Sequence, residues 1–342
     1  ARVDYDGTAS SLLVEPQSTN LILYSQDISN AAWTKSSGGT GSTPVVTANY
    51  TASPLEGEMA DRVIFNLNGG TASADLSTLQ SSSFNLTLGD NVTYYMAVKT
   101  NDGSTVNMTL NNNLGLSEVK SITPEWTIIK TSTTATSTSS GVLRLRLRGS
   151  EAVSGYADVS VSYVQLESLS FATSYIPTSG STVTRVKDQY EKTGISNLIN
   201  SEEGVLFAEI AALSDDLTDR YIMLSDGGWN NRIQLNYENV SNTIEARVFV
   251  GSFEQFDTSF VLTDITLNNK FAIKWKVNDF ALWVNGVEVD TDSSGSVPSA
   301  NTLNELSFKD GQGSNNFYGK VKQLQVFKTA LTDTELATLT TQ

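Results

Sequence analysis

The segment SDGGWNNRIQL, residues 225–235, places an indole among turn-forming and planar polar residues. Trp229 follows two glycines and precedes Asn230, Asn231 and Arg232. A tryptophan ring can stack on the C–H face of a sugar, while amide and guanidinium groups donate hydrogen bonds to its hydroxyls. We therefore take these four residues as candidate glycan-binding residues. The alternative is that Trp229 is a turn tryptophan folded over the edge of the core.

Trp283 is a second candidate platform for a sugar, in the segment LWVNGVEV. Asn285-Gly286 is the preferred pair for a two-residue type I′ turn, and it predicts that residue 284 pairs with 287, 282 with 289 and 280 with 291. This register puts Trp283 on the outer face and a set of apolar residues on the core face: Phe280, Leu282, Val284, Val287 and Val289. The alternative for Trp283 is packing on lysine stems.

Three acids follow this turn at alternate positions, Glu288, Asp290 and Asp292. A two-residue period puts them on one face, and paired carboxylates can cleave a glycosidic bond. A retaining pair must hold its carboxyl groups about 5 Å apart on either side of the sugar, and nothing in this spacing indicates that. We interpret the acids as a solvated strand face and expect no catalytic residue, so the chain is predicted not to be an enzyme.

The sequence contains neither Cys nor His, so few of its residues could bind a metal ion and none could act as a thiol. This composition excludes Ser-His-Asp triads, thiolate nucleophiles and zinc sites with the usual ligands. The loop Asp310-Gly-Gln-Gly-Ser-Asn315 has oxygen atoms at alternating positions, as a calcium loop does. Too few carboxylates accompany it, so we predict a tight loop, no metal site and no cofactor.

An alternation of leucine and arginine defines the strongest predicted strand. Leu143, Leu145 and Leu147 fall on one face, and the other face carries Arg144, Arg146 and Arg148. One interpretation is a cationic stripe that grips an acidic sugar. The other is a solvated face whose arginines pair with acids across the sheet, and the net charge of −15 favours it.

The acidic composition also limits the partners. No cluster of Lys and Arg offers the basic footprint that nucleic acids or anionic membrane surfaces require. The sequence has no apolar run of about 18 residues, so we expect no membrane insertion.

Short β-type runs alternate with Gly, Asn, Ser and Thr clusters along the chain, which predicts an all-β fold. The pattern breaks near the segment that begins at Pro177. We expect two β-sandwich (jelly-roll) domains with these boundaries: an extended connector over 1–19, a jelly roll over 20–178 and a second sandwich over 179–342. A short helix over 332–340 is predicted to close the chain, because Thr332 and Glu335 can form a capping box.

The segment at residues 3–35, VDYDGTASSLLVEPQSTNLILYSQDISNAAWTK, resembles one that recurs in bacteriophage tail-fibre and virion proteins. The matching positions are Arg2, Asp4, Tyr5, Leu12, Leu13, Glu15, Pro16, Thr19, Asn20, Leu21, Ser25, Trp33, Thr34 and Lys35. Residues 164–188, VQLESLSFATSYIPTSGSTVTRVKD, resemble the end of the same fibre module. LWVNGVEV and NFYGKVKQLQVFKTALTDTELATL resemble the hairpin and closing segment of a concanavalin A-like (laminin G-like) sandwich.

These resemblances imply a carbohydrate-binding jelly roll followed by a concanavalin A-like lectin domain. They imply a non-catalytic fibre or spike, located extracellularly on the virion, that binds a cell-surface polysaccharide, contacts other virion proteins and forms a homotrimer. They also imply that the chain is cut from a longer fibre, with Leu12, Leu13, Leu21 and Leu23 docking the connector on the sandwich. The alternatives are the binding module of a polysaccharide-degrading enzyme and a purely structural virion protein.

Overall fold

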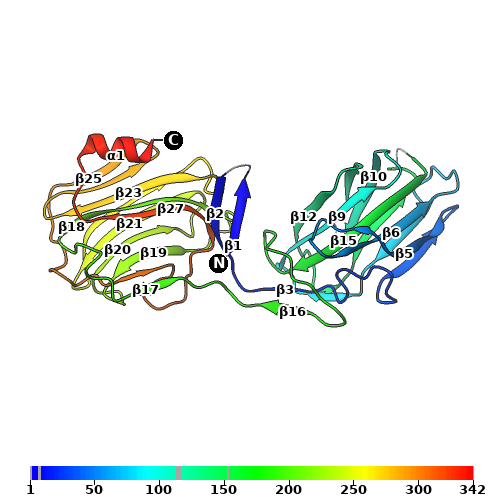
Figure 1. Cartoon of the computed structure of the whole chain (residues 1–342), viewed down its shortest axis with the longest axis horizontal. Helices are drawn as coiled ribbons and strands as arrows, with labels where there is room; N and C mark the ends of the chain where they lie inside the picture. Colours follow the sequence, from blue (N-terminus) through cyan, green and yellow to red (C-terminus); the bar gives the residue numbers. More distant parts are fainter. Residues whose placement is uncertain (1, 7–8, 113–116, 152–153, 342) are drawn as a thin grey trace. The chain divides into compact units, whose positions relative to one another are not determined.

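The computed structural model describes residues 2–6, 9–112, 117–151 and 154–341. The chain divides into two compact units (Figure 1). Gln17–Val186 form the N-terminal unit, and Ala1–Pro16 join Lys187–Gln342 in the C-terminal unit. Both units are built of antiparallel strands, which confirms the all-β prediction. No helix in the described parts is long and apolar enough to cross a membrane.

The N-terminal unit is a sandwich of two five-stranded sheets, ordered β11-β10-β14-β7-β4 and β12-β9-β15-β6-β5. The strands of the first sheet are β4 (Thr34–Gly38), β7 (Leu76–Gln80), β10 (Val106–Asn112), β11 (Ser117–Ile122) and β14 (Leu143–Arg148). Those of the second are β5 (Ser42–Ala52), β6 (Met59–Asn66), β9 (Asn91–Thr100), β12 (Thr127–Thr134) and β15 (Tyr156–Glu167). Four short strands pair beside them: β3 (Ser18–Asn20) with β16 (Val183–Arg185), and β8 (Phe84–Leu86) with β13 (Ser139–Gly141).

One apolar core fills the space between these sheets. Its members occupy alternate positions along the strands, as a two-residue period requires. On β9 and β15 the opposite face carries a second apolar cluster around Tyr95, Ala97 and Tyr163. On β14, Leu143, Leu145 and Leu147 are fully buried in that core, as predicted. Trp33 is also buried in this core, and its Nε1 donates to the carbonyl of Tyr24 at 2.8 Å, which holds the segment before β4 in place.

The C-terminal unit packs a seven-stranded sheet, β1-β2-β27-β18-β23-β24-β25, on a six-stranded sheet, β17-β26-β19-β20-β21-β22. The strands of the first are β1 (Arg2–Asp6), β2 (Ala9–Val14), β18 (Glu203–Ala212), β23 (Asn269–Lys276), β24 (Phe280–Val284), β25 (Val287–Asp292) and β27 (Gly319–Phe327). Those of the second are β17 (Glu191–Thr193), β19 (Arg220–Ser225), β20 (Arg232–Tyr237), β21 (Thr243–Val250), β22 (Phe253–Val261) and β26 (Glu305–Ser307).

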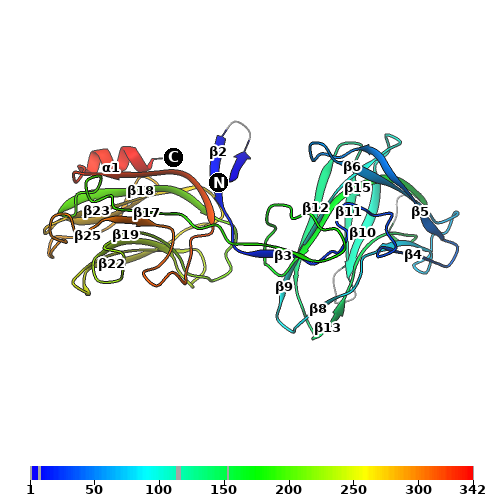
Figure 2. The ribbon, with the colours of Figure 1, turned by 60° about the horizontal axis from the view of Figure 1, so that its bottom comes forward.

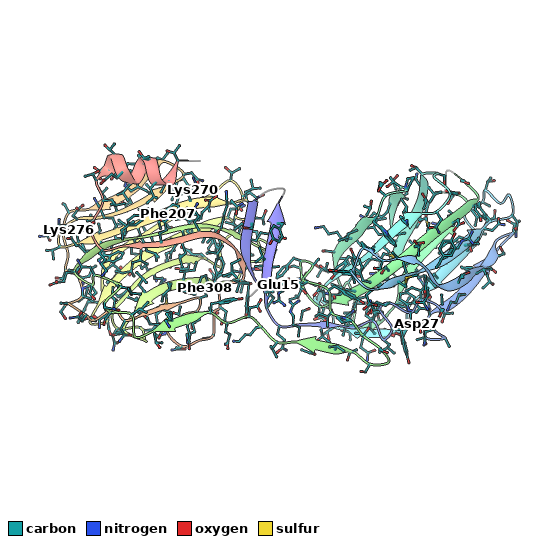
Figure 3. All side chains as sticks on the ribbon, viewed as in Figure 1. Glu15, Asp27, Phe207, Lys270, Lys276 and Phe308 are labelled. Carbon is teal, nitrogen blue, oxygen red and sulfur yellow. The ribbon has the colours of Figure 1, made fainter. Side chains whose placement is uncertain are left out.

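The helix α1 (Asp333–Thr340) covers the outer face of the seven-stranded sheet (Figures 1 and 2). Thr332 and Glu335 form the predicted capping box, and Leu336 is fully buried against the sheet. Lys270, labelled in Figure 3, donates to the carbonyl of Thr341 at 2.7 Å. The helix therefore closes the domain from outside the sandwich, as its sequence indicates.

The expected domain boundaries differ from the observed ones at the N-terminus. Residues 1–19 were expected to form an extended connector, whereas β1 and β2 form a hairpin that belongs to the C-terminal unit. Leu12 on β2 pairs with Val321 on β27, and Val14 enters the C-terminal core. The units separate at residues 16/17 and 186/187, instead of at 19/20 and 178/179. The pairing of β2 with β27 joins segments about 300 residues apart, and local patterns carry no signal of it.

The predicted register of the β24–β25 hairpin holds only next to its turn. Val284 pairs with Val287 as expected, but a β-bulge then places Leu282 opposite Asp290 and Phe280 opposite Asp292. A bulge adds one residue to one strand and reverses which face the following side chains occupy. Glu288 lies opposite Trp283, so the three acids Glu288, Asp290 and Asp292 do not share one face as a two-residue period predicts.

A partly buried ionic network holds the β1–β2 hairpin to the rest of the C-terminal unit. The Asp188 carboxylate accepts from the backbone N of Glu15 at 2.9 Å and pairs with Arg2. Arg2 Nε also lies 3.0 Å from Glu15, a buried carboxylate at the end of β2 that is labelled in Figure 3. The Asp188 carboxylate thus neutralises the charge of Arg2 and also accepts the backbone hydrogen bond of Glu15.

Asp188→Ala is expected to lower the free energy of unfolding of the C-terminal unit by about 2 kcal/mol, because it removes hydrogen bonds to a charged group. Denaturant-dependent hydrogen exchange of peptides from β18 and β23 measures this quantity. Asp4→Ala is the matched control, since it removes the exposed pair of Asp4 with Lys320, worth at most about 1 kcal/mol. Equal effects of the two substitutions would contradict the anchoring role of Asp188.

Candidate functional site

The outer face of the six-stranded sheet carries polar and aromatic side chains in register. The core side of β19–β22 is apolar, with Ile222, Leu224, Ile233, Leu235, Ile244, Ala246 and Val248 buried. The strand pairs on the outer side are Tyr221 with Asn236, Arg232 with Phe249, Gln234 with Arg247, Asn236 with Glu245 and Arg247 with Asp257. We call these side chains, together with Trp229, the Trp229 face.

The loop at residues 226–231 joins β19 to β20 and positions Trp229. Asp226 accepts from the backbone N of Gly228 at 3.0 Å and from Asn231 Nδ2 at 2.8 Å. Asn231 Oδ1 in turn accepts from the backbone N of Gly251 at 2.9 Å, and Asn230 Oδ1 accepts from Ser252 Oγ at 2.6 Å. These bonds fasten the loop to the β21–β22 turn, so both asparagines have a structural role there.

Arg232 is a buried cation held between two rings. Its side chain lies at the start of β20 with 6% of the residue exposed. The guanidinium carbon is 3.5 Å from the ring centroid of Phe249 and 4.6 Å from that of Trp229. Its Nε donates to Gln234 Oε1 at 2.8 Å, and another nitrogen donates to the Trp229 carbonyl. Burial, reinforced by the charge of Arg247, lowers the pKa of Arg232 to about 10.

Trp229 is half-buried, and its ring packs against Tyr221, Arg232 and the loop at Gly311. Tyr221 meets it edge to face with centroids 5.9 Å apart, and Arg232 lies over it. A Cβ on Gly311 would come within 2.9 Å of the indole, so the absence of a side chain at Gly311 is what lets the loop beneath approach. The ring is therefore held in a fixed orientation while part of it stays accessible.

The structure brings together four of the five predicted site residues. Trp229, Asn230, Asn231 and Arg232 are contiguous and share the loop and the start of β20. Asn231 and Arg232 were expected to donate hydrogen bonds to sugar hydroxyls. Both already donate to acceptors within the protein, and a sugar would compete with those acceptors.

The expectation of an exposed platform at Trp283 is wrong. Trp283 lies on the other sheet, is 8% exposed and packs beneath α1 with Leu336. The physical reason is that α1 covers the outer face of that sheet, so an outward position there is still an interior one.

Sequence reasoning missed the residues that surround Trp229 on the neighbouring strands. Tyr221 contacts the Trp229 ring, and Phe249 contacts Arg232 beside it. Arg247 shares the face with them through the register of β19, β20 and β21. The usable signal was the alternation of TIEARVFV, in which Glu245, Arg247 and Phe249 fall on one face.

Arg247 is the centre of an ionic network on this face. Its guanidinium makes a two-point contact with Asp257, at 2.9 and 3.1 Å, and lies 2.9 Å from Glu245 and 3.9 Å from Glu254. About a third of the Arg247 side chain is exposed, at 32%. Burial raises the pKa of the Glu245 carboxyl above its ordinary value, although Arg247 opposes this. Burial also raises the pKa of Tyr221 to about 12, so its hydroxyl stays protonated at neutral pH.

The Asp310 loop is a self-bonded turn. Asp310 Oδ1 accepts from the backbone N of Gln312 at 3.1 Å and of Ser314 at 2.8 Å, and Oδ2 accepts from that of Asn315 at 3.1 Å. Its oxygens therefore already have donors inside the loop. In the described ranges, no group of three or more His, Cys, Asp or Glu residues is arranged to hold a metal ion.

No protein-family model and no curated protein matches this sequence. Among solved structures, the chain is similar to the Ruminococcus gnavus IT-sialidase CBM40, with 16% identity and a TM-score of 0.37 over 46% of this chain and 98% of that one. It is similar to the CBM22-1 xylan-binding domain of Paenibacillus barcinonensis Xyn10C, with 15% identity and a TM-score of 0.29 over 49% and 100%. It is also similar to mouse laminin alpha1 domains LG4-5, with 12% identity and a TM-score of 0.29 over 73% and 88%. These values describe a distant resemblance in shape.

Glu245→Gln is expected to stabilise the C-terminal unit at pH 7. A raised carboxyl pKa means that the folded state binds the proton more tightly, so ionised Glu245 costs stability above that pKa. The gain of the variant over the wild type should shrink as the pH falls through the folded pKa towards the ordinary value of 4.5. Thermal unfolding from pH 7 to pH 4 measures it.

Glu254→Gln serves as the control, because it removes a more exposed acid beside the same arginine. A Glu245→Gln variant that is less stable than the wild type at pH 7 would show that the pair with Arg247 outweighs the burial of the carboxylate.

Proposed function

We propose that the chain is a non-catalytic glycan-binding protein and that the Trp229 face receives a sugar. The observation that carries this proposal is the meeting of two partly exposed aromatic rings, Trp229 and Tyr221, with exposed charged groups on a rigid sheet. A pyranose presents a C–H face to a ring, and its hydroxyls both donate and accept hydrogen bonds. Arg247 supplies donors and Asp257 supplies acceptors beside the rings, while Asn231 and Arg232 hold the loop.

One ring and a few hydrogen bonds supply roughly 4–5 kcal/mol, which corresponds to a Kd of order 0.1–1 mM. Such a site is useful when several copies act together, because linked sites multiply their apparent affinity. This requirement fits the fibre resemblance of residues 2–35 and 164–188.

The finer proposal is a fragment of a bacteriophage fibre or spike. In it, the chain lies outside the cell on the virion, binds host polysaccharide and contacts other virion proteins. The two fibre-like segments support this assignment over the binding module of a polysaccharide-degrading enzyme. A genome in which the adjacent genes encode tail or capsid proteins would agree with it, and adjacent genes for polysaccharide-degrading enzymes would favour the second candidate.

Trp229→Ala is expected to weaken glycan binding at least tenfold, because the stacking surface is lost, and to lower the melting temperature by only a few degrees. A glycan array identifies the bound sugar, and titration calorimetry with that sugar measures the loss. Trp126→Ala is the matched control, since Trp126 is also half-buried and also lies under a cation, Lys99, at 5.4 Å, but in the other unit.

The second variant is Trp229→Phe, which retains a ring and should keep part of the affinity. Full binding by Trp229→Ala, or unfolding of the C-terminal unit in both variants, would make Trp229 a structural residue.

We also propose that the chain forms a homotrimer, as its fibre resemblance implies, and association would stabilise a chain without disulfides. Light scattering should give about three times the chain mass of 36.9 kDa. A mass of one chain at high protein concentration would contradict self-association of these residues.

A further inference from the structure

A second polar face lies on the N-terminal unit, on the outer side of the sheet β11-β10-β14-β7-β4. Its central strand, β14, points Arg144, Arg146 and Arg148 outward while its leucines fill the core. Alternate residues of a strand lie about 6.6 Å apart, so the three guanidinium groups are close neighbours. We call these arginines and their outward cross-strand partners the arginine face.

The cross-strand partners of the three arginines are neutral. On β7 they are Gln80, Thr78 and Leu76, and on β10 they are Asn111 and Thr109. The expected pairing with acids on the neighbouring strands is therefore wrong, and the acid that does pair with Arg148 follows β14 in the chain. Acids prevail in the chain as a whole, but the register brings none of them to these positions. The neighbouring stretches 113–116 and 152–153 contain no acid in the sequence either.

One carboxylate compensates this face. Glu151, in the turn after β14, pairs with Arg148 at 2.7 Å and lies 4.0 Å from Arg146. Arg144 donates instead to neutral oxygens, Gln80 Oε1 at 2.7 Å and Asn111 Oδ1 at 3.2 Å. Three cations and one anion leave a local charge of +2, in a chain whose net charge is −15.

The arginines are packed along the sheet instead of extending into solvent. The side chain of Arg146 is 14% exposed and that of Arg148 is 30% exposed. The buried Nε of Arg146 has no hydrogen-bond partner in the described parts of the chain. Its Nη2 makes a long hydrogen bond to Ser117 Oγ, at 3.4 Å, and lies 4.0 Å from the Glu151 carboxylate. Burial lowers the pKa of Arg146; the charge of Glu151 opposes this, and the charges of Arg148 and Arg144 add to it. A solvated surface stripe would have neither this burial nor an unpartnered buried Nε.

We propose that the arginine face binds the anionic groups of an acidic polysaccharide, with Arg146 at the centre of the site. A guanidinium fork matches the two oxygens of a carboxylate or sulfate, and the flanking amides and hydroxyls suit sugar hydroxyl groups. Because Gln80 and Asn111 hold Arg144 in place, little side-chain entropy is lost on binding. This site extends the proposed function to the other unit and does not depend on Trp229.

The test uses the full chain with polygalacturonate, its fully methyl-esterified form, dextran sulfate and neutral dextran, measured by titration calorimetry. Wild type should bind polygalacturonate and bind neither the methyl ester nor neutral dextran. Arg146→Gln should weaken that binding at least tenfold, and Arg146→Lys at least threefold, because lysine retains the charge but lacks the fork. Arg144→Gln is a second variant at the same face, used in case Arg146→Gln fails to fold. It should also weaken the binding of polygalacturonate.

Lys130→Gln is the matched control, because it removes one exposed charge from β12 on the other sheet of the same unit. It should bind as wild type does. If Arg146→Gln loses both polyanions, the face recognises oxyanions in general; if it loses polygalacturonate alone, the face recognises carboxylates. Either result supports the proposal. Equal binding of the methyl ester, equal effects of Arg146→Gln and Lys130→Gln, or no binding of either polyanion by the wild type would overturn it.

Discussion

The two-residue period of an antiparallel strand is the constraint on which both units depend. Each strand must give one face to the core of its sandwich, and its other face is left for solvent, a covering element or a ligand. β14 shows the division clearly, with leucines inward and arginines outward. The seven-stranded sheet shows the third possibility, because α1 covers its outer face and makes Trp283 an interior residue.

Local patterns predicted much of the fold because they depend on neighbours in sequence. Two local features depend on no more than four consecutive residues, and both are present. They are the capping box of Thr332 and Glu335 and the turn at Asn285-Gly286. The bulge after Glu288 and the pairing of β2 with β27 are settled by strands packed from elsewhere. The same distinction applies to the candidate site. The Trp229 loop could be predicted from contiguous residues, whereas Tyr221 and Phe249 are placed beside it only by the strand register.

The Trp229 face shows why adjacency in sequence does not establish a shared role. Trp229, Asn231 and Arg232 are neighbours in the chain, but the last two hold the loop by bonds to Asp226 and Gln234. Arg232 is buried with no ion pair to a carboxylate among the described residues, and the rings of Phe249 and Trp229 attract its charge through their faces. The residues able to meet a ligand are thus the more exposed ones on adjacent strands, above all Arg247.

The two outer faces use arginine in opposite ways. Arg247 has carboxylates of Glu245 and Asp257 at 2.9 Å, so its charge is compensated within the protein, and in the proposed sugar site it acts as a directional donor. Arg146 has its nearest carboxylate at 4.0 Å and two further arginines on its own strand. An anion approaching Arg247 is repelled by the acids around it. An anion approaching Arg146 instead reduces the repulsion between the three arginines of β14. The first environment favours neutral hydroxyls, and the second favours a charged group.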